Sequence, residues 1–192
     1  MIQLYRVVPW LPSASLGQPG HPLFVDVSRQ GGGRADNPRH YQALYVSESA
    51  AGAVGESFGD HLDWSHEMFD VPWLAGANRA LATFRADPPP KVLDLDDPSV
   101  LLRLGARPTE VVGRDRERTR EIALAVWLES RWQGLRWWSW WRPAWRNQVL
   151  WASPEAANPW PLEVVEVEEL ALSHPAVVLA ADVLKRRLQT GR

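Results

Sequence analysis

Short segments of alternating or mainly apolar residues recur along the chain, and this pattern is typical of β-strands. The segments are bounded by proline, glycine and polar clusters, which predict turns. Strands are predicted at Ile2–Val8, His21–Val25, Gln42–Val46, around Phe84, Lys91–Leu95, Leu135–Ser139, Asn147–Trp151 and Val164–Val167.

Helical spacing of apolar residues predicts fewer helices, and these do not alternate regularly with the strands. Ser47 is a suitable N-cap for a helix that carries Glu56 late in its length. Other helices are predicted at Pro98–Leu104, Arg114–Arg131 and Ser173–Leu188, and Asp60–Gly76 is an irregular connection with a short helix at its end. Short strands that outnumber irregularly placed helices favour an α+β fold over a doubly wound parallel sheet.

Composition limits the classes of protein to consider. The chain has 192 residues, which fits one domain, and a net charge of −2, which does not suggest a nucleic-acid-binding surface. The absence of cysteine excludes disulfides and thiolate metal sites. Pro9 interrupts the first apolar residues too early for a signal peptide, and no apolar run approaches about 18 residues. We therefore expect a soluble, cytoplasmic protein.

A glycine-rich loop provides the first candidate chemistry. Gly31–Gly33 can adopt positive φ and approach a ligand closely, and Arg34 follows directly as a candidate phosphate ligand. The loop has neither a GxGxxG pattern nor a lysine followed by serine or threonine, so neither common nucleotide-binding motif is supported. A solvated surface loop is the alternative interpretation of this segment.

Three other groups are weaker candidates. His61 and His66 lack the spacing of adjacent helical metal ligands, and we expect no metal site. Asp94, Asp96 and Asp97 fit a solvated strand end better than a cation site. Most of the 12 tryptophans lie in residues 127–151. This density predicts a core together with an exposed aromatic patch for self-association or another protein partner.

Several short motifs occur in an order that resembles the RES domain family, which is named for an arginine, a glutamate and a serine. They are Tyr5-Arg6, Gly33-Arg34, Leu44-Tyr45, Glu56, Gly134–Ser139 and Asn147–Trp151. The resemblance extends over nearly the whole chain. It implies one domain, residues 1–192, with a fold similar to ADP-ribosyltransferase toxins: a core of short, mostly antiparallel strands flanked by helices.

The resemblance also implies a set of site residues. The catalytic residues would be Arg34, Glu56 and Ser139, and the residues that bind NAD would be Arg6, Tyr45 and Asn147. Many family members follow the loop arginine with an aromatic residue and an asparagine. This chain instead continues with Ala35, Asp36, Asn37 and Pro38.

The chemistry of these side chains suits NAD cleavage. Breaking the nicotinamide–ribose bond passes through an oxocarbenium-like state, which a carboxylate such as Glu56 can stabilise. Arg6 and Arg34 could hold the pyrophosphate by charge-assisted hydrogen bonds. Tyr45 could stack on nicotinamide, and Ser139 could form a hydrogen bond near the ribose or an incoming phosphate.

Characterised members of the family are toxins that degrade NAD by phosphorolysis or hydrolysis and are neutralised by a helix-turn-helix antitoxin of the Xre class. The resemblance therefore implies an NAD phosphorylase or glycohydrolase with NAD as its substrate, inorganic phosphate as a second substrate in phosphorolysis, and an Xre antitoxin as partner. We also expect a homo-oligomer that contacts nucleic acid only through the antitoxin. Two alternatives remain, namely ADP-ribosyl transfer to a macromolecule and a non-catalytic protein with a vestigial pocket.

Overall fold

A seven-stranded sheet organises the computed structural model, which describes residues 1–156 and 159–189. Its strand order is β5-β6-β7-β2-β1-β4-β8. The strands are β1 (Ile2–Trp10), β2 (Gln42–Ser47), β4 (Asn78–Ala86), β5 (Val92–Asp94), β6 (Gly134–Trp138), β7 (Arg146–Ala152) and β8 (Glu163–Glu169). Neighbouring strands are antiparallel except for the parallel pair β5 and β6, so the expected α+β class with a mostly antiparallel sheet is confirmed.

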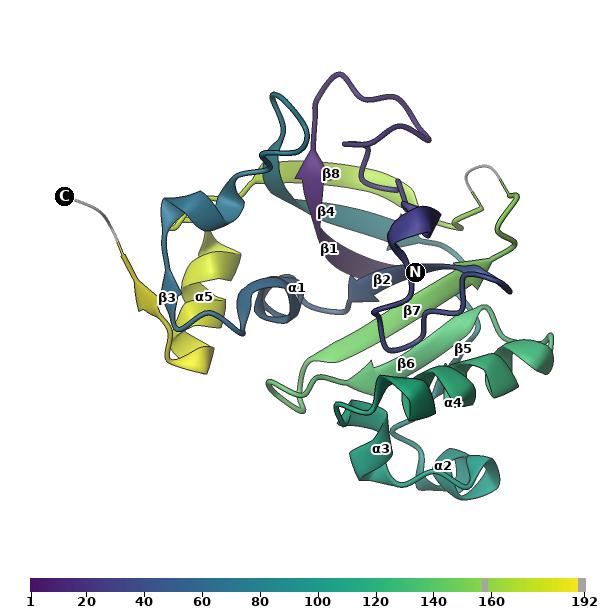
Figure 1. Cartoon of the computed structure of the whole chain (residues 1–192). Helices are drawn as coiled ribbons and strands as arrows, with labels where there is room; N and C mark the ends of the chain where they lie inside the picture. Colours follow the sequence, from purple (N-terminus) through teal and green to yellow (C-terminus); the bar gives the residue numbers. More distant parts are fainter. Residues whose placement is uncertain (157–158, 190–192) are drawn as a thin grey trace.

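The sheet opens between its two central strands. β1 pairs with β4 along its whole length, from Ile2 opposite Ala86 to Trp10 opposite Asn78. β2 likewise pairs with β7 along its whole length. Between β1 and β2, the registered pair is Tyr5 with Ser47. Figure 1 shows β1 running at a steep angle to β2 from this junction.

Two groups of helices cover different parts of the sheet (Figure 1). In the first, α1 (Ala50–Phe58) and α5 (Pro175–Leu184) share a core with Leu81 of β4. In the second, α4 (Arg116–Leu128) shares a core with residues of β5, β6 and β7, close to the short helices α2 (Pro98–Leu104) and α3 (Pro108–Val112). The remaining short elements are the 3-10 helices Val27–Arg29 and His66–Phe69 and the parallel pair β3 (Asp63–Trp64) and β9 (Arg187–Leu188).

Helix α1 sits unusually close to the tryptophan-rich segment because glycines form its contact face. A Cβ at Gly55 would lie 2.4 Å from Cζ3 of the buried Trp145, and a Cβ at Gly59, just past the helix, would lie 2.6 Å from Cε2 of Trp141. The helix begins after Ser49, whose side chain accepts a hydrogen bond from the Gly52 amide at 2.9 Å. The prediction of Ser47 as N-cap was therefore wrong, because Ser47 is the last residue of β2.

The predicted strand His21–Val25 is absent, and the segment forms turns. Its carbonyl groups bond to side chains instead of a neighbouring strand: Arg6 donates to the Pro22 and Phe24 carbonyls, and the Trp160 indole donates to the Leu23 carbonyl. These carbonyls are therefore not paired with the backbone of a neighbouring strand.

Two other predicted elements differ from the structure, and one helix was not predicted. The closing helix ends at Leu184, because Lys185 adopts a left-handed conformation and the chain then pairs as β9. The predicted connection Asp60–Gly76 contains β3 and a 3-10 helix in its middle rather than a helix at its end. Trp64 in this connection is fully buried, which shows that the segment is packed into the core. The short helix α3 was not predicted.

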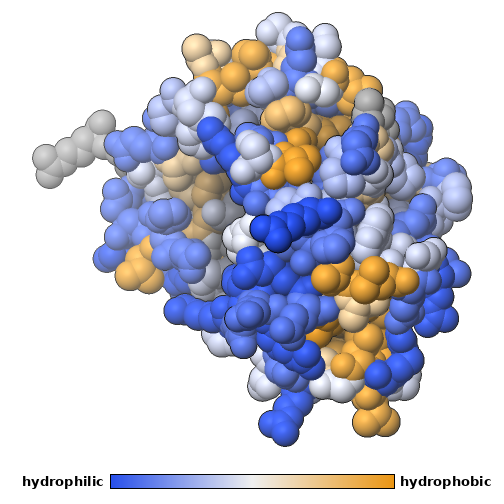
Figure 2. Space-filling model, turned by 45° about the vertical axis from the view of Figure 1, so that its right-hand side comes forward, coloured by the Kyte–Doolittle hydropathy of each residue, from blue (hydrophilic) through white to orange (hydrophobic). Residues whose placement is uncertain are grey.

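The tryptophan-rich segment is mainly core. Trp137, Trp145 and Trp151 are buried, whereas Trp140 is 61% exposed. The expected aromatic patch is thus reduced to Trp140 and its partly buried neighbours. The face drawn in Figure 2 is mostly hydrophilic, with hydrophobic patches separated from one another. None of the described helices is long and apolar enough to span a bilayer.

The packing of α1 leads to a test with Gly55→Ala. Helix propensity alone would stabilise this variant by about 1 kcal/mol. Overpacking against Trp145 costs about 1–3 kcal/mol, so we expect a net decrease in the free energy of unfolding, measured by urea denaturation. Gly32→Ala is the control, because nothing lies within 4 Å of the added Cβ. If Gly55→Ala is as stable as wild type or more so, α1 is not seated on Trp145.

Candidate functional site

A cavity of about 310 Å³ lies where β1 and β2 separate. Its wall brings together four predicted site residues from separate elements, namely Arg6, Tyr45, Glu56 and Asn147. Other residues in the wall are Tyr5, Gly33, Ser47, Ser57 and Trp137. The two remaining predicted residues, Arg34 and Ser139, lie outside this wall.

Glu56 is held at the cavity by a partner on the sheet. Nδ2 of Asn147 donates to Oε1 of Glu56 at 2.8 Å, which connects β7 to α1. Asn147 is buried, whereas Glu56 is exposed, so its carboxylate is accessible from solvent. The amide fixes one carboxylate oxygen and leaves acceptor capacity on the group for a ligand.

Arg6 enters the cavity wall from the opening in the sheet. Its Nη1 donates to the carbonyls of Pro22 and Phe24, at 3.1 and 3.2 Å. Within the described part of the chain, no carboxylate forms an ion pair with Arg6. Burial lowers the pKa of the guanidinium to about 10. Because charged groups that are shielded from water are normally paired, this partly buried arginine is suited to receive an anion.

The glycine-rich loop is folded around a buried carboxylate. Oδ2 of Asp36 accepts hydrogen bonds from the amides of Gly31 and Gly33, at 2.8 and 2.7 Å, and Oδ1 accepts one from the Tyr45 hydroxyl at 2.7 Å. A Cβ at Gly33 would lie 2.5 Å from the Tyr45 hydroxyl oxygen. Gly33 is therefore required by the close approach of Tyr45 and Asp36. Asp36 therefore holds this loop together.

Arg34 points from the loop toward α3. Its Nη1 donates to the carbonyls of Val111 and Gly113, at 2.6 and 2.9 Å, and its Nη2 donates to the Val112 carbonyl at 3.2 Å. Burial and the nearby Arg116 lower the pKa of Arg34 to about 10, while the charge of Glu56 acts in the opposite direction. Arg34 therefore connects the loop to the end of α3 and interacts electrostatically with the cavity.

Ser139 is fully buried in the turn that follows β6. Its hydroxyl oxygen accepts a hydrogen bond from the Trp141 amide at 3.0 Å, and its amide donates to the Trp145 carbonyl at 2.8 Å. These contacts set the path of the chain between Trp141 and Trp145, the two tryptophans that contact α1 and the residue after it.

Comparison with known proteins identifies the family. The RES domain matches residues 4–173. The chain belongs to the RES domain family. In fold, it is similar to a solved structure described as the M.tuberculosis MbcT-MbcA toxin-antitoxin complex, with a TM-score of 0.63 and 18% sequence identity over 96% of this chain and 89% of that one. No curated protein matches the chain significantly.

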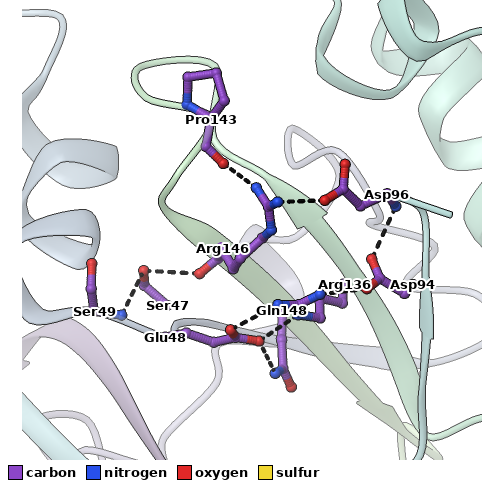
Figure 3. Close-up of polar contacts among 9 residues, drawn as sticks. All are labelled: Ser47, Glu48, Ser49, Asp94, Asp96, Arg136, Pro143, Arg146 and Gln148. Carbon is purple, nitrogen blue, oxygen red and sulfur yellow. Dashed lines mark hydrogen bonds and ion pairs between the residues drawn. The ribbon is translucent and has the colours of Figure 1, made fainter.

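A network of charged side chains connects the strands that flank the start of α1 (Figure 3). Nε of Arg136 donates to Oε1 of Glu48 at 2.6 Å, and the same guanidinium pairs with Asp94. Nε2 of Gln148 also donates to Oε1 of Glu48, at 2.7 Å. Burial acts to raise the pKa of Glu48, but the bonds from Arg136 and Gln148 outweigh it and lower the pKa.

The same network fixes the start of α1. The carbonyl of Arg146 accepts hydrogen bonds from the Glu48 amide at 2.8 Å and from the Ser47 hydroxyl at 3.2 Å, while the Arg146 guanidinium pairs with Asp96 (Figure 3). Ser49, the N-cap of α1, follows directly. Alternation along β7 places Asn147 on the opposite face from Arg146 and Gln148. The network therefore orients both the helix that carries Glu56 and the strand that carries Asn147.

Tyr5, Trp137 and Asp36 were not predicted from the sequence as site residues. Trp137 lies opposite Asn147 in the pairing of β6 with β7, and its ring meets that of Tyr45 edge-on at 6.3 Å. The sequence alone does not show that β6 pairs with β7. Without that pairing, alternation along β6 cannot predict that Trp137 lies beside Asn147. Among the described residues, no group of three or more His, Asp or Glu side chains is arranged to hold a metal ion.

Tyr41, which is buried, and Tyr45, which is partly buried, lead to a pH-dependent prediction. Burial raises the pKa of Tyr41 and of Tyr45, and Asp36 adds to the effect on Tyr45. Because the folded-state pKa lies above the unfolded value of 10.0, this stabilisation is present below pH 10 and is lost as the pH rises further. We expect the free energy of unfolding to fall above pH 10, and to fall less steeply in Tyr45→Phe.

Phenolate absorbance recorded alongside unfolding provides the check. Tyr45 should ionise only as the protein unfolds. If wild type and Tyr45→Phe differ by one phenol that titrates near pH 10 while both remain folded, the placement of Tyr45 against Asp36 is wrong.

Proposed function

We propose that this RES domain protein consumes NAD by cleaving the bond between nicotinamide and ribose. The observation that carries the proposal is the pairing of Glu56 with Asn147 in a cavity whose wall also contains Arg6, which has no carboxylate partner among the described residues. A carboxylate and an unpaired cation suit the two charges of the substrate, the positive nicotinamide ribose and the negative diphosphate. Membership of the RES domain family supports the same reaction.

The proposed reaction is a substitution at the ribose C1′. The bond from C1′ to the pyridinium nitrogen breaks, and its electron pair stays with nicotinamide, which leaves as a neutral molecule. The oxocarbenium-like centre is then captured by water, which loses its proton, or by an oxygen of inorganic phosphate. Capture by water gives nicotinamide and ADP-ribose. Capture by phosphate gives nicotinamide and the 1′-phosphate of ADP-ribose.

Glu56 is the catalytic residue of this proposal. Positive charge moves onto the ribose as the bond breaks, and a fixed negative charge beside it stabilises that state more than the ground state. Asn147 keeps the carboxylate oriented, and so reduces the reorganisation needed during the reaction. The edge-on pair of Tyr45 and Trp137 lies in the same wall and offers aromatic surface to nicotinamide.

The two other residues of the RES signature act in this proposal through neighbouring elements. Arg34 connects the glycine loop to α3 and adds positive potential, and Ser139 holds the turn on which α1 rests. Arg6 is the direct diphosphate ligand, because Nη2 and Nε remain outside its hydrogen bonds to carbonyls.

We further propose that the chain is the toxin of a toxin–antitoxin pair. The similar solved structure is described as a toxin–antitoxin complex, which supports an antitoxin partner. An antitoxin of the Xre class, phosphate as the acceptor, and self-association belong to the same proposal. Incubation with NAD, with and without phosphate, tests the chemistry through its products. Nicotinamide release supports NAD cleavage, a modified macromolecule would indicate ADP-ribosyl transfer, and intact NAD would contradict both.

Glu56→Gln provides the sharpest test of mechanism. It preserves size and the contact with Asn147 but removes the negative charge, so turnover should fall by roughly 100-fold or more while NAD affinity changes little. Single-turnover cleavage and NAD titration on the same preparation measure both quantities. Glu166→Gln, an exposed change on the edge strand β8, is the control and should match wild type. Full turnover in Glu56→Gln would reject Glu56 as the catalytic carboxylate.

A further inference from the structure

A second cavity adjoins the first at Arg6. It has a volume of about 340 Å³. β1 contributes to both walls, with Tyr5–Val7 in the first and Arg6, Val8 and Pro9 in the second. Its other walls come from the N-terminal loop and from the segment that contains Trp73. The two cavities therefore form neighbouring compartments with one shared arginine.

The shared arginine has the chemistry of an anion site. Nη1 is occupied by the Pro22 and Phe24 carbonyls, which orient the guanidinium. Nη2 and Nε make no hydrogen bond within residues 1–156 and 159–189. The other arginine in the second wall, Arg29, is paired with Asp26 at 3.3 Å, which offsets its charge. An anion that bridges the compartments would thus be held at Arg6.

The second cavity presents an aromatic ring and a polar donor. Trp73 is 53% exposed, and the guanidinium of Arg79 lies over its ring at 5.1 Å from the centroid. A ring already covered on one side by a cation provides a defined platform for a planar ligand on the other. Nδ1 of His21 accepts a hydrogen bond from the Leu23 amide, so the neutral imidazole carries its proton on Nε2 and can donate from there.

We propose that the second cavity binds the adenosine half of the dinucleotide, with the base on Trp73 and the diphosphate at Arg6. This inference rests on the proposed function, because it assigns nicotinamide ribose to the Glu56 cavity. A dinucleotide consists of two nucleosides joined by a diphosphate. In the same way, the protein has two cavities, one for each nucleoside, with an arginine for the diphosphate between them. The second cavity then determines affinity for the whole dinucleotide, whereas Glu56 determines the rate of bond cleavage.

Substrates that share the scissile bond separate these roles. Nicotinamide mononucleotide has the same nicotinamide–ribose bond as NAD but lacks the adenosine half. We expect Trp73→Ala to raise the KM for NAD about tenfold, because stacking of a base on an aromatic side chain contributes on this order. The kcat for NAD and the kcat/KM for nicotinamide mononucleotide should stay within about twofold of wild type. Trp73→Phe, which keeps an aromatic ring, should restore most of the NAD affinity.

Trp140→Ala is the matched control, since Trp140 is an exposed tryptophan outside both cavity walls. It should leave the KM for NAD unchanged. An unchanged NAD KM in Trp73→Ala, or an equal loss with both substrates, would overturn the assignment of the second cavity while leaving NAD cleavage itself intact.

Calorimetric titration with ADP separates this inference from the proposed reaction, because it requires no turnover. Binding of ADP to wild type that weakens about tenfold in Trp73→Ala supports the second cavity even if NAD is not cleaved. In that case the proposed function fails and the adenosine site stands. Absence of ADP binding to a wild-type protein that cleaves NAD would overturn the adenosine site alone.

Discussion

The opening between β1 and β2 is the constraint on which the site depends. Each strand is fully paired on its outer side, β1 with β4 and β2 with β7, so both stay in the sheet although they meet at Tyr5 and Ser47. Continuous pairing between them would have closed the sheet and left no space for ligand. Both central strands line the first cavity, whereas only β1 lines the second, and Arg6 belongs to both walls.

Placing an arginine at this boundary requires compensation from the protein. Burial disfavours the charged guanidinium and lowers its pKa, and the carbonyls of the N-terminal loop supply hydrogen bonds but no negative charge. This explains why residues 21–25 form turns around Arg6 instead of a strand. An anionic ligand at Arg6 would therefore offset an electrostatic cost that burial imposes on the guanidinium in the free protein.

The position of Glu56 depends on contacts far from it in sequence. α1 is seated through Gly55 on Trp145, and Ser139 sets the turn that presents this tryptophan. At the other end of the helix, the network of Glu48, Arg136 and Gln148 holds the junction with β2. Since Asn147 belongs to the same strand as Gln148, one set of strands orients both members of the Glu56–Asn147 pair. Of Arg34, Glu56 and Ser139, only Glu56 lines the cavity, and the other two contact elements that adjoin it.

Local patterns in the sequence determined most of the elements. Alternation predicted β1, β2, β6 and β7, and helical spacing with a polar start predicted α4, because these signals depend on residues within a few positions of one another. The order of short motifs was sufficient to indicate the family and to bring Arg6, Tyr45, Glu56 and Asn147 into one hypothesis. Tertiary structure alone decided the rest. The turns at residues 21–25, the end of the closing helix at Leu184 and the direction of Arg34 toward α3 all depend on partners distant in sequence. A local pattern specifies which donors and acceptors are present. The pairing of strands and the packing of helices decide which of them form hydrogen bonds with one another.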